Sequence, residues 1–172
     1  DAGIGYLKVD YNETIGIGVD GAESPGEGLR RHIEGVYRFF RRIREELPEL
    51  VIENCSSGGN RLEPSMIALT DMSSFSDAHE SLEIPIIAAN LHRLILPAQS
   101  QIWAVLHADD TIERTRYLLT SGFLGRMCLS GEIWDLDSRQ MDQVRRAVEF
   151  HGSVSEMIRD GRSRIQRTVS RS

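Results

Sequence analysis

Polar side chains alternate with apolar ones near the start of the chain, in the stretch YLKVDYN (6–12). Lys8, Asp10 and Asn12 are each separated by one residue, and residues i and i+2 of a β-strand point to the same side. An ammonium beside a carboxyl group favours its ionised form, and an ionised, oriented carboxylate is suited to nucleophilic attack. A buried ion pair without a catalytic role explains the same spacing.

A second candidate carboxyl group lies in the stretch SFSDAHES (74–81). A retaining glycosidase uses two carboxyl groups about 5 Å apart, one as the nucleophile and the other as the general acid. We expect Asp77 to be the general acid, because it follows an apolar stretch that is predicted to be a strand, and Glu53 and Glu80 are its rivals. A helix N-cap or an Asx-turn is the structural alternative for Asp77.

A polar turn follows another predicted strand, in the stretch ENCSSGGNR (53–61). It offers a thiol, hydroxyl groups, glycines and an arginine where a sugar ring could approach the backbone. The thiol of Cys55 could instead be a nucleophile with His79 as its base. The turn alone does not decide between these interpretations.

Strand and helix patterns alternate along the chain and would position these residues. Asp137 and Ser138 are the expected N-caps of the last helix. The alternation indicates parallel strands with helical crossovers. We predict strands over 4–10, 50–55, 72–80, 101–106 and 125–131, and helices over 25–47, 84–97, 110–125 and 138–158, with a short helix between the second and third strands.

Two architectures have this order, a doubly wound sheet and part of a (β/α)8 barrel. No GxGxxG sequence follows the first strand, which removes support for a dinucleotide-binding sheet. Polar residues gather at the carboxyl ends of successive strands, where barrel enzymes build their active sites. Because a complete barrel takes roughly 250 residues, we predict an α/β fold, a partial (β/α)8 TIM barrel over 1–160, with a polar, basic tail or linker over 161–172.

Composition argues against several classes of function. The net charge of −6 disfavours nucleic-acid binding, and the longest apolar run, 84–97, is too short and too polar to span a membrane. The two cysteines have no metal-ligand spacing. We therefore expect no metal and no other cofactor, and a reducing compartment, the cytoplasm, is the simplest location.

Three stretches together resemble one enzyme family. YLKVDYN is similar to the nucleophile motif K-W-D-x-N of family-36 glycoside hydrolases, the α-galactosidase or melibiase family. ENCSSGGNR resembles that family's C-S-x-G-G-x-R loop, and FSDAHES lies where the family has its S-D-x-x-D acid/base motif. The motifs occur in the family's order and at roughly its spacing, within a resemblance that runs from Gly5 to about Met157.

This resemblance implies a retaining hydrolase that cleaves terminal α-galactosides by double displacement without a cofactor. Asp10 would be the nucleophile and Asp77 the general acid/base. The departures from the family pattern, which suggest a divergent subfamily, are Val9, Glu13 and Glu80. Five further residues would line the galactose site: Lys8, Asn12, Cys55, Ser57 and Arg61.

The resemblance also implies that the chain corresponds to about strands four to eight of the catalytic barrel. Unpaired sheet edges invite pairing, so we expect the chain to self-associate or to pack with the missing barrel half, and to have weak or no turnover alone. Two alternatives remain open, namely a carbohydrate-binding remnant without catalysis and a galactosyl transglycosylase of the same clan.

Overall fold

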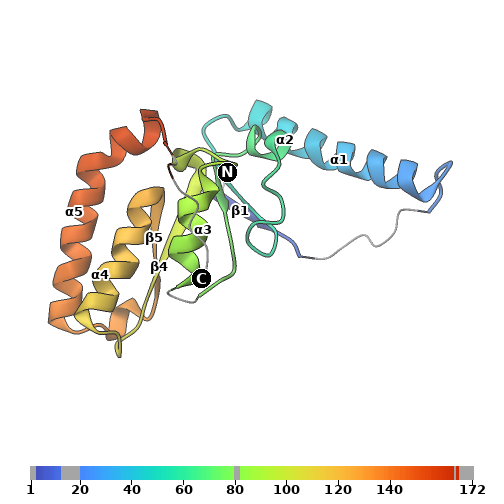
Figure 1. The fold of residues 1–172 in the computed structure, drawn as a ribbon. Helices are drawn as coiled ribbons and strands as arrows, with labels where there is room; N and C mark the ends of the chain where they lie inside the picture. Colours follow the sequence, from blue (N-terminus) through green and yellow to red (C-terminus); the bar gives the residue numbers. More distant parts are fainter. Residues whose placement is uncertain (1–2, 13–19, 80–81, 165, 167–172) are drawn as a thin grey trace.

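The computed structural model describes residues 3–12, 20–79, 82–164 and 166. In this part of the chain, strands and helices alternate as the sequence predicts (Figure 1). The strands are β1 (Tyr6–Asp10), β2 (Val51–Cys55), β3 (Met72–Ser74), β4 (Ser100–Leu106) and β5 (Arg126–Gly131). The α-helices are α1 (Pro25–Glu46), α2 (Pro64–Ile67), α3 (Glu83–Leu91), α4 (Ile112–Ser121) and α5 (Ser138–Asp160).

The described strands form one parallel sheet in the order β1-β2-β3-β4-β5. Each strand pairs with the next one along the chain, without the reversal of strand order that characterises a doubly wound sheet. Consecutive parallel strands with helical crossovers are the wall of a (β/α)8 barrel. The predicted fold class, a partial barrel, is therefore confirmed.

Three hydrophobic clusters attach the helices to the outer face of the sheet. Phe40 of α1 packs with Ile52 of β2. Ile84 of α3 packs with Ile102 of β4. A third cluster joins α4 and α5 to β4 and β5, and α1 lies at the opposite end of the structure from these two helices (Figure 1). Val9 also packs against the first cluster, so it faces outward as predicted.

The helix boundaries agree with the capping signals except in α3. Asp137 caps α5 with a complete capping box, and Ser138 is the first helical residue. The predicted helix 84–97 ends at Leu91 instead, because the chain turns through hydrogen bonds from the N–H groups of Leu94 and Ile95 to the Leu91 carbonyl. The imidazole of His92 forms a hydrogen bond with the carbonyl of Leu124, which joins that turn to the segment after α4.

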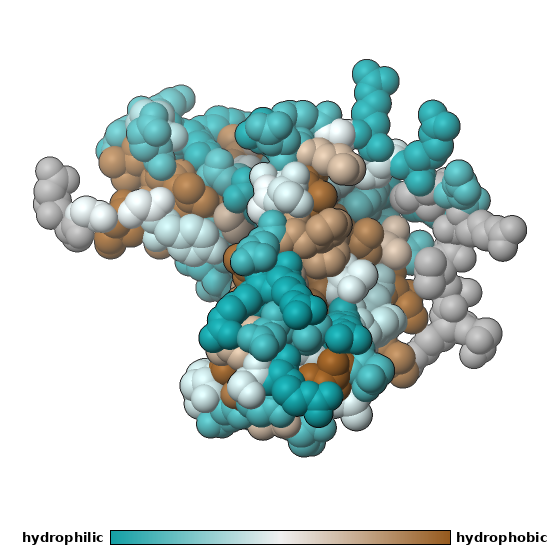
Figure 2. Space-filling view, turned by 90° about the vertical axis from the view of Figure 1, so that its left-hand side faces the viewer, coloured by the Kyte–Doolittle hydropathy of each residue, from teal (hydrophilic) through white to brown (hydrophobic). Residues whose placement is uncertain are grey.

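The outer surface is mixed in polarity. On the face that carries α5, hydrophilic side chains predominate and small hydrophobic areas lie between them (Figure 2). Within the described residues, no helix has both the length and the apolar character needed to cross a bilayer. α5 ends at Asp160, and the division into residues 1–160 and a tail over 161–172 stays a prediction.

Removing a core side chain of β4 should destabilise the sheet. Ile102 is fully buried, so we expect Ile102→Ala to lower the free energy of unfolding in urea by about 2–5 kcal/mol. The matched control is Ile33→Ala on α1, whose side chain is 41% exposed and which should lose less than about 1 kcal/mol. Equal losses in the two variants would contradict the assignment of the core.

Candidate active site at the carboxyl edge of the sheet

The predicted site residues converge on the carboxyl ends of β1, β2 and β3. Asp10 is the last residue of β1 and pairs in register with Cys55, the last residue of β2. Asp77 follows the end of β3. The turn after β2 reaches across to this segment, where Gly58 forms a bridge with Ser76. Both candidate carboxyl groups therefore belong to one edge of the sheet.

Gly58 makes the close approach between these two segments possible. Its φ of 73° favours glycine, and a Cβ atom at this position would overlap the backbone of Ser76 and Asp77. The preceding residue, Ser57, also has a positive φ of 42°. The glycine in this turn thus has a steric role, which is to bring the backbone next to Asp77 against the end of β2.

The side chain of Glu53 lies at the centre of the inner face of the sheet and is only 3% exposed. Its Oε1 lies 3.3 Å from Nζ of Lys8 and accepts a hydrogen bond of 2.6 Å from the Ser74 hydroxyl. Its Oε2 accepts hydrogen bonds from the Tyr6 hydroxyl and, at 3.3 Å, from Nε2 of Gln101. The charge of Lys8 is therefore balanced by a carboxylate on the neighbouring strand.

Asp10 and Asp77 are both exposed. The structure describes no hydrogen bond or ion pair between either carboxylate and another described residue, and the ion pair of Lys8 is with Glu53, not with Asp10. Lys8 and Asp10 nevertheless lie on one side of the sheet, because they are two residues apart in β1. Glu80, the other rival for the acid, lies outside the described residues, as does Glu13.

Burial raises the pKa of the Cys55 thiol, and the nearby Gly58 backbone, Ser74 and Lys8 offset this only partly. A buried thiol with a raised pKa is mostly protonated at neutral pH and is a poor nucleophile. The ring of His79 packs edge-on against Trp103, with 5.4 Å between the ring centres. These contacts do not support the thiol-nucleophile interpretation.

Asn12 and Ser57 meet where the turn after β2 crosses the chain beyond β1. The Asn12 side-chain oxygen accepts a hydrogen bond of 2.6 Å from the N–H of Ser57, and the Ser56 hydroxyl donates to the carbonyl of Tyr11 at 3.0 Å. These bonds hold Asn12 and Ser57, two of the predicted sugar-site residues, together just beyond the carboxyl ends of β1 and β2.

Arg61 joins the same two strands through its guanidinium group. Nη2 donates to the carbonyl oxygens of Val9, at 3.1 Å, and of Cys55. The guanidinium carbon lies 4.1 Å from the centre of the Tyr11 ring, a cation–π distance. Nε and Nη1 are buried and have no hydrogen-bond partner within the described residues.

Sequence reasoning missed the polar partners of Lys8 on the inner face. The sequence indicates Glu53 only as a rival acid and does not single out Ser74, Gln101 or Trp103. Nε1 of Trp103 donates to Oε1 of Gln101 at 3.1 Å. The sequence gives no clear signal for them, because polar residues stand next to each other in β2 and β3 instead of alternating with apolar ones.

A second polar region lies at the carboxyl ends of β4 and β5, around a hollow of about 540 Å³. Nδ1 of His107 lies 2.9 Å from a carboxylate oxygen of Glu132. This hydrogen bond raises the pKa of His107, and the charges of Asp110 and Asp109 act in the same direction. The pair is more than a third exposed, which screens its energy.

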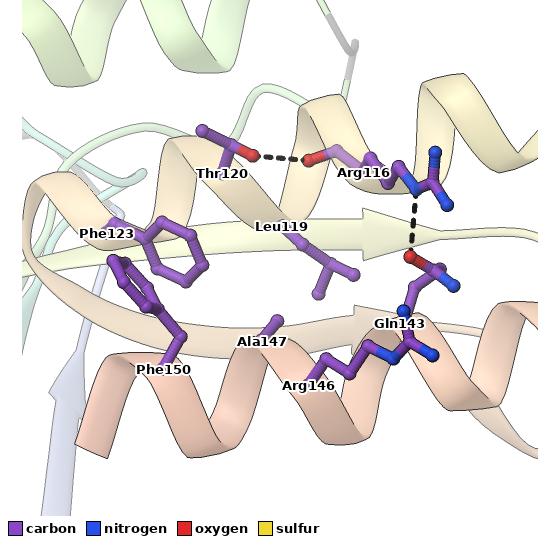
Figure 3. Close-up of a pocket in the computed structure, with 8 residues that line it drawn as sticks. All are labelled: Arg116, Leu119, Thr120, Phe123, Gln143, Arg146, Ala147 and Phe150. Carbon is purple, nitrogen blue, oxygen red and sulfur yellow. Dashed lines mark hydrogen bonds between the residues drawn. The ribbon is translucent and has the colours of Figure 1, made fainter. Parts of the chain in front are cut away.

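A hollow of about 300 Å³ on the outer face contains none of the predicted site residues. It lies between α4 and α5, where the rings of Phe123 and Phe150 stand at one end and the guanidinium groups of Arg116 and Arg146 at the other (Figure 3). Nε of Arg116 donates to Oε1 of Gln143 at 2.8 Å. This hollow is separate from the carboxyl edge, because it is formed by α4 and α5 on the outer side of the sheet.

Comparison with known proteins finds one family and several α-galactosidases that are similar to this chain. A family model described as Melibiase matches residues 1–161. Alpha-galactosidase 2 of Pediococcus pentosaceus is 33% identical over 81 residues, which are 45% of this chain and 11% of that protein. Alpha-galactosidase AgaA of Geobacillus stearothermophilus is 25% identical over 177 residues, which cover 93% of this chain and 23% of that protein.

Solved structures agree in fold. The crystal structure of an α-galactosidase from Lactobacillus brevis has a TM-score of 0.79 at 20% identity, covering 91% of this chain and 22% of that one. Two structures of Geobacillus AgaA variants, in complex with raffinose and with stachyose, have TM-scores of 0.71 and 0.70 at 19% identity and cover 90% of this chain and 22% of theirs. The chain thus spans less than a quarter of the length of these relatives.

The raised pKa of His107 gives a prediction for NMR titration. We expect Glu132→Gln to lower this pKa towards its ordinary value near 6.5. Because the folded-state pKa is raised, the pair stabilises the fold below the unfolded-state pKa, and that contribution is lost as the pH rises through the folded-state value. The control is Glu113→Gln, an exposed carboxyl of the first turn of α4, which should leave the His107 titration unchanged. An unchanged titration in Glu132→Gln would refute the pairing.

Proposed function

Because the chain belongs to the melibiase family, we propose that it carries the two catalytic carboxyl groups of a retaining hydrolase of terminal α-galactosides. The observation that supports this most directly is the common location of Asp10 and Asp77. The register of β1 and β2 and the close approach at Gly58 bring their segments to one edge of the sheet. Barrel enzymes bind and convert their substrates at this edge.

In the proposed reaction, the carboxylate of Asp10 attacks the anomeric carbon of the galactoside. The bond from that carbon to the leaving oxygen breaks, and Asp77 gives its proton to this oxygen. In the second step, Asp77 takes a proton from a water molecule as the water oxygen attacks the same carbon. The bond to Asp10 then breaks, and galactose leaves with retained configuration.

The remaining site residues would bind the sugar hydroxyl groups through donors that the fold leaves available. Lys8 has three N–H donors, and a single carboxylate pairs with its ammonium. Arg61 is fixed at the same edge by its Nη2, which donates to the carbonyl oxygens of Val9 and Cys55. The amide of Asn12, the Ser57 hydroxyl and the Cys55 thiol border the same edge. Galactosyl oligosaccharides are the proposed substrates, and raffinose and stachyose, found in complexes of Geobacillus AgaA, are the first to test.

Substitution of either carboxyl group tests this proposal. We expect Asp10→Asn to reduce turnover of an aryl α-galactoside by at least about 1000-fold, because no covalent intermediate can form. Asp77→Asn should cost about 10²–10⁴-fold with a poor leaving group and much less with a strongly acidic phenol, which needs little protonation.

The matched control is Asp142→Asn on α5, whose side chain is 58% exposed and which should keep full activity. If the wild-type chain hydrolyses the substrate and Asp10→Asn does so equally well, Asp10 is not the nucleophile. Binding of galactose without any turnover in the wild-type chain would favour the carbohydrate-binding alternative. Transfer of galactose to an added sugar acceptor in preference to water would favour the transglycosylase.

We also propose that the chain self-associates or packs with further barrel strands. Within the described residues, β1 and β5 each pair with one strand only, and an edge of this kind offers free N–H and C=O groups to another strand. Light scattering coupled to size-exclusion chromatography should therefore give a mass above the 19.4 kDa of one chain. A stable monomer with full activity on an aryl α-galactoside would overturn this proposal.

A further inference from the structure

We propose that Glu53 is the positioning residue of the sugar site, whose carboxylate holds the ammonium of Lys8 in the orientation that presents it to a sugar hydroxyl beside Asp10. This inference rests on the proposed function for the identity of the ligand. The contact between Glu53 and Lys8 and its effect on the lysine can be tested without a ligand.

The carboxylate of Glu53 is fully occupied by donors from three other positions of the sheet besides Lys8. Oε1 accepts from Ser74 at 2.6 Å and lies 3.3 Å from Nζ of Lys8. Oε2 accepts from Tyr6 and from Gln101. A carboxylate has about four lone-pair directions, so neither oxygen is left to protonate a leaving group or to bind a sugar. Glu53 therefore acts through Lys8 and does not touch the substrate.

Lys8 is held from a second side by an aromatic ring. Its Nζ lies 5.9 Å from the centre of the Trp103 ring, within the range of a cation–π contact. Trp103 is itself fixed, because its Nε1 donates to Gln101, which bonds Glu53. The ring of His79, two residues beyond Asp77, packs edge-on against the ring of Trp103. These contacts thus connect the Lys8 ammonium, on the strand of Asp10, with the segment after β3 that contains Asp77.

The ammonium remains accessible despite these contacts. The side chain of Lys8 is 39% exposed, whereas that of Glu53 is 3% exposed. An exposed lysine ordinarily samples many rotamers, and fixing it is costly in entropy. A buried carboxylate anchored by three neutral donors supplies a fixed partner, so the orientation of the amine is set before a sugar arrives. Preorganisation of this kind strengthens binding.

The chain allows a selective test, because Lys8 is the only lysine among its 20 lysine and arginine residues. An amine-acylating reagent therefore modifies Lys8 and the terminal α-amino group alone, and mass spectrometry gives both rates. We expect Glu53→Gln, which keeps the shape and removes the charge, to raise the acylation rate of Lys8 about fivefold relative to the α-amino group. The control is Glu49→Gln, an exposed carboxyl before β2, which should not change this ratio.

A spectroscopic readout separates positioning from a loss of fold. After ¹³C-methylation, the N-methyl protons of Lys8 should show nuclear Overhauser effects to the Trp103 ring in the wild-type chain, and these should be lost in Glu53→Gln while the Ile102 core signals persist. Unchanged acylation and unchanged Overhauser effects in a folded Glu53→Gln variant overturn the proposal. If that variant does not fold, Glu53→Asp is tested instead. Its side chain is shorter, so its carboxylate should also release Lys8. An unchanged acylation rate of Lys8 in Glu53→Asp would again overturn the proposal.

Sugar binding then connects the positioning to function. Where the wild-type chain binds galactose, Glu53→Gln should weaken binding about tenfold, and equal affinity in the two proteins contradicts the proposal. Where the wild-type chain binds neither galactose nor raffinose, the proposed function has failed for this chain. In that case the acylation and Overhauser measurements still decide whether Glu53 positions Lys8.

Discussion

The buried negative charge of Glu53 is the constraint that organises the inner face of the sheet. Burying an ionised carboxylate is costly unless hydrogen bonds and an opposite charge compensate it. At 3% exposure, Glu53 meets this requirement with donors from β1, β3 and β4 and with the single lysine of the chain. Polar side chains of β1, β3 and β4 therefore gather around Glu53 on the inner face, whereas Ile52 and Ile102 point outward and pack against the helices.

The alternation of faces carries this inner polarity to the carboxyl edge. Asp10 lies two residues beyond Lys8 on β1, and Cys55 lies two residues beyond Glu53 on β2. In the register of the two strands, Lys8 pairs with Glu53 and Asp10 pairs with Cys55. Between the two residues of β1, Val9 packs outward against α1 and β2, and between the two residues of β2, Asn54 is buried and donates to the carbonyl of Arg61. Beyond the strands, the absence of a side chain at Gly58 lets the turn lie against the backbone at Asp77. The candidate site therefore depends on two features, the polar network around Glu53 in the sheet and the close backbone contact at Gly58 beyond the strands.

The sequence was sufficient for the features that depend on neighbours along the chain. Strand alternation, the capping box at Asp137 and the outward position of Val9 are local, and the structure has all three. The partner of Lys8 was not predictable in this way, because spacing along β1 indicates Asp10 and only the register across β1 and β2 shows Glu53. The early end of α3 was not predictable either, because the apolar pattern continues to Leu96 while the chain turns after Leu91.

The same geometry implies that the proposed catalysis should depend on what covers the inner face of the sheet. Asp10 and Asp77 are exposed, and water that solvates a carboxylate weakens both its nucleophilicity and the electrostatic interactions around it. Lys8 and Glu53 are fixed by strands within the described sheet, so sugar recognition can be preorganised here. Exclusion of water requires surfaces on the other side of the ligand, which in a closed barrel come from the opposing strands and their loops. In the proposed function, sugar recognition and turnover are therefore separable, because recognition would depend on the sheet itself and turnover on the surfaces that close over it.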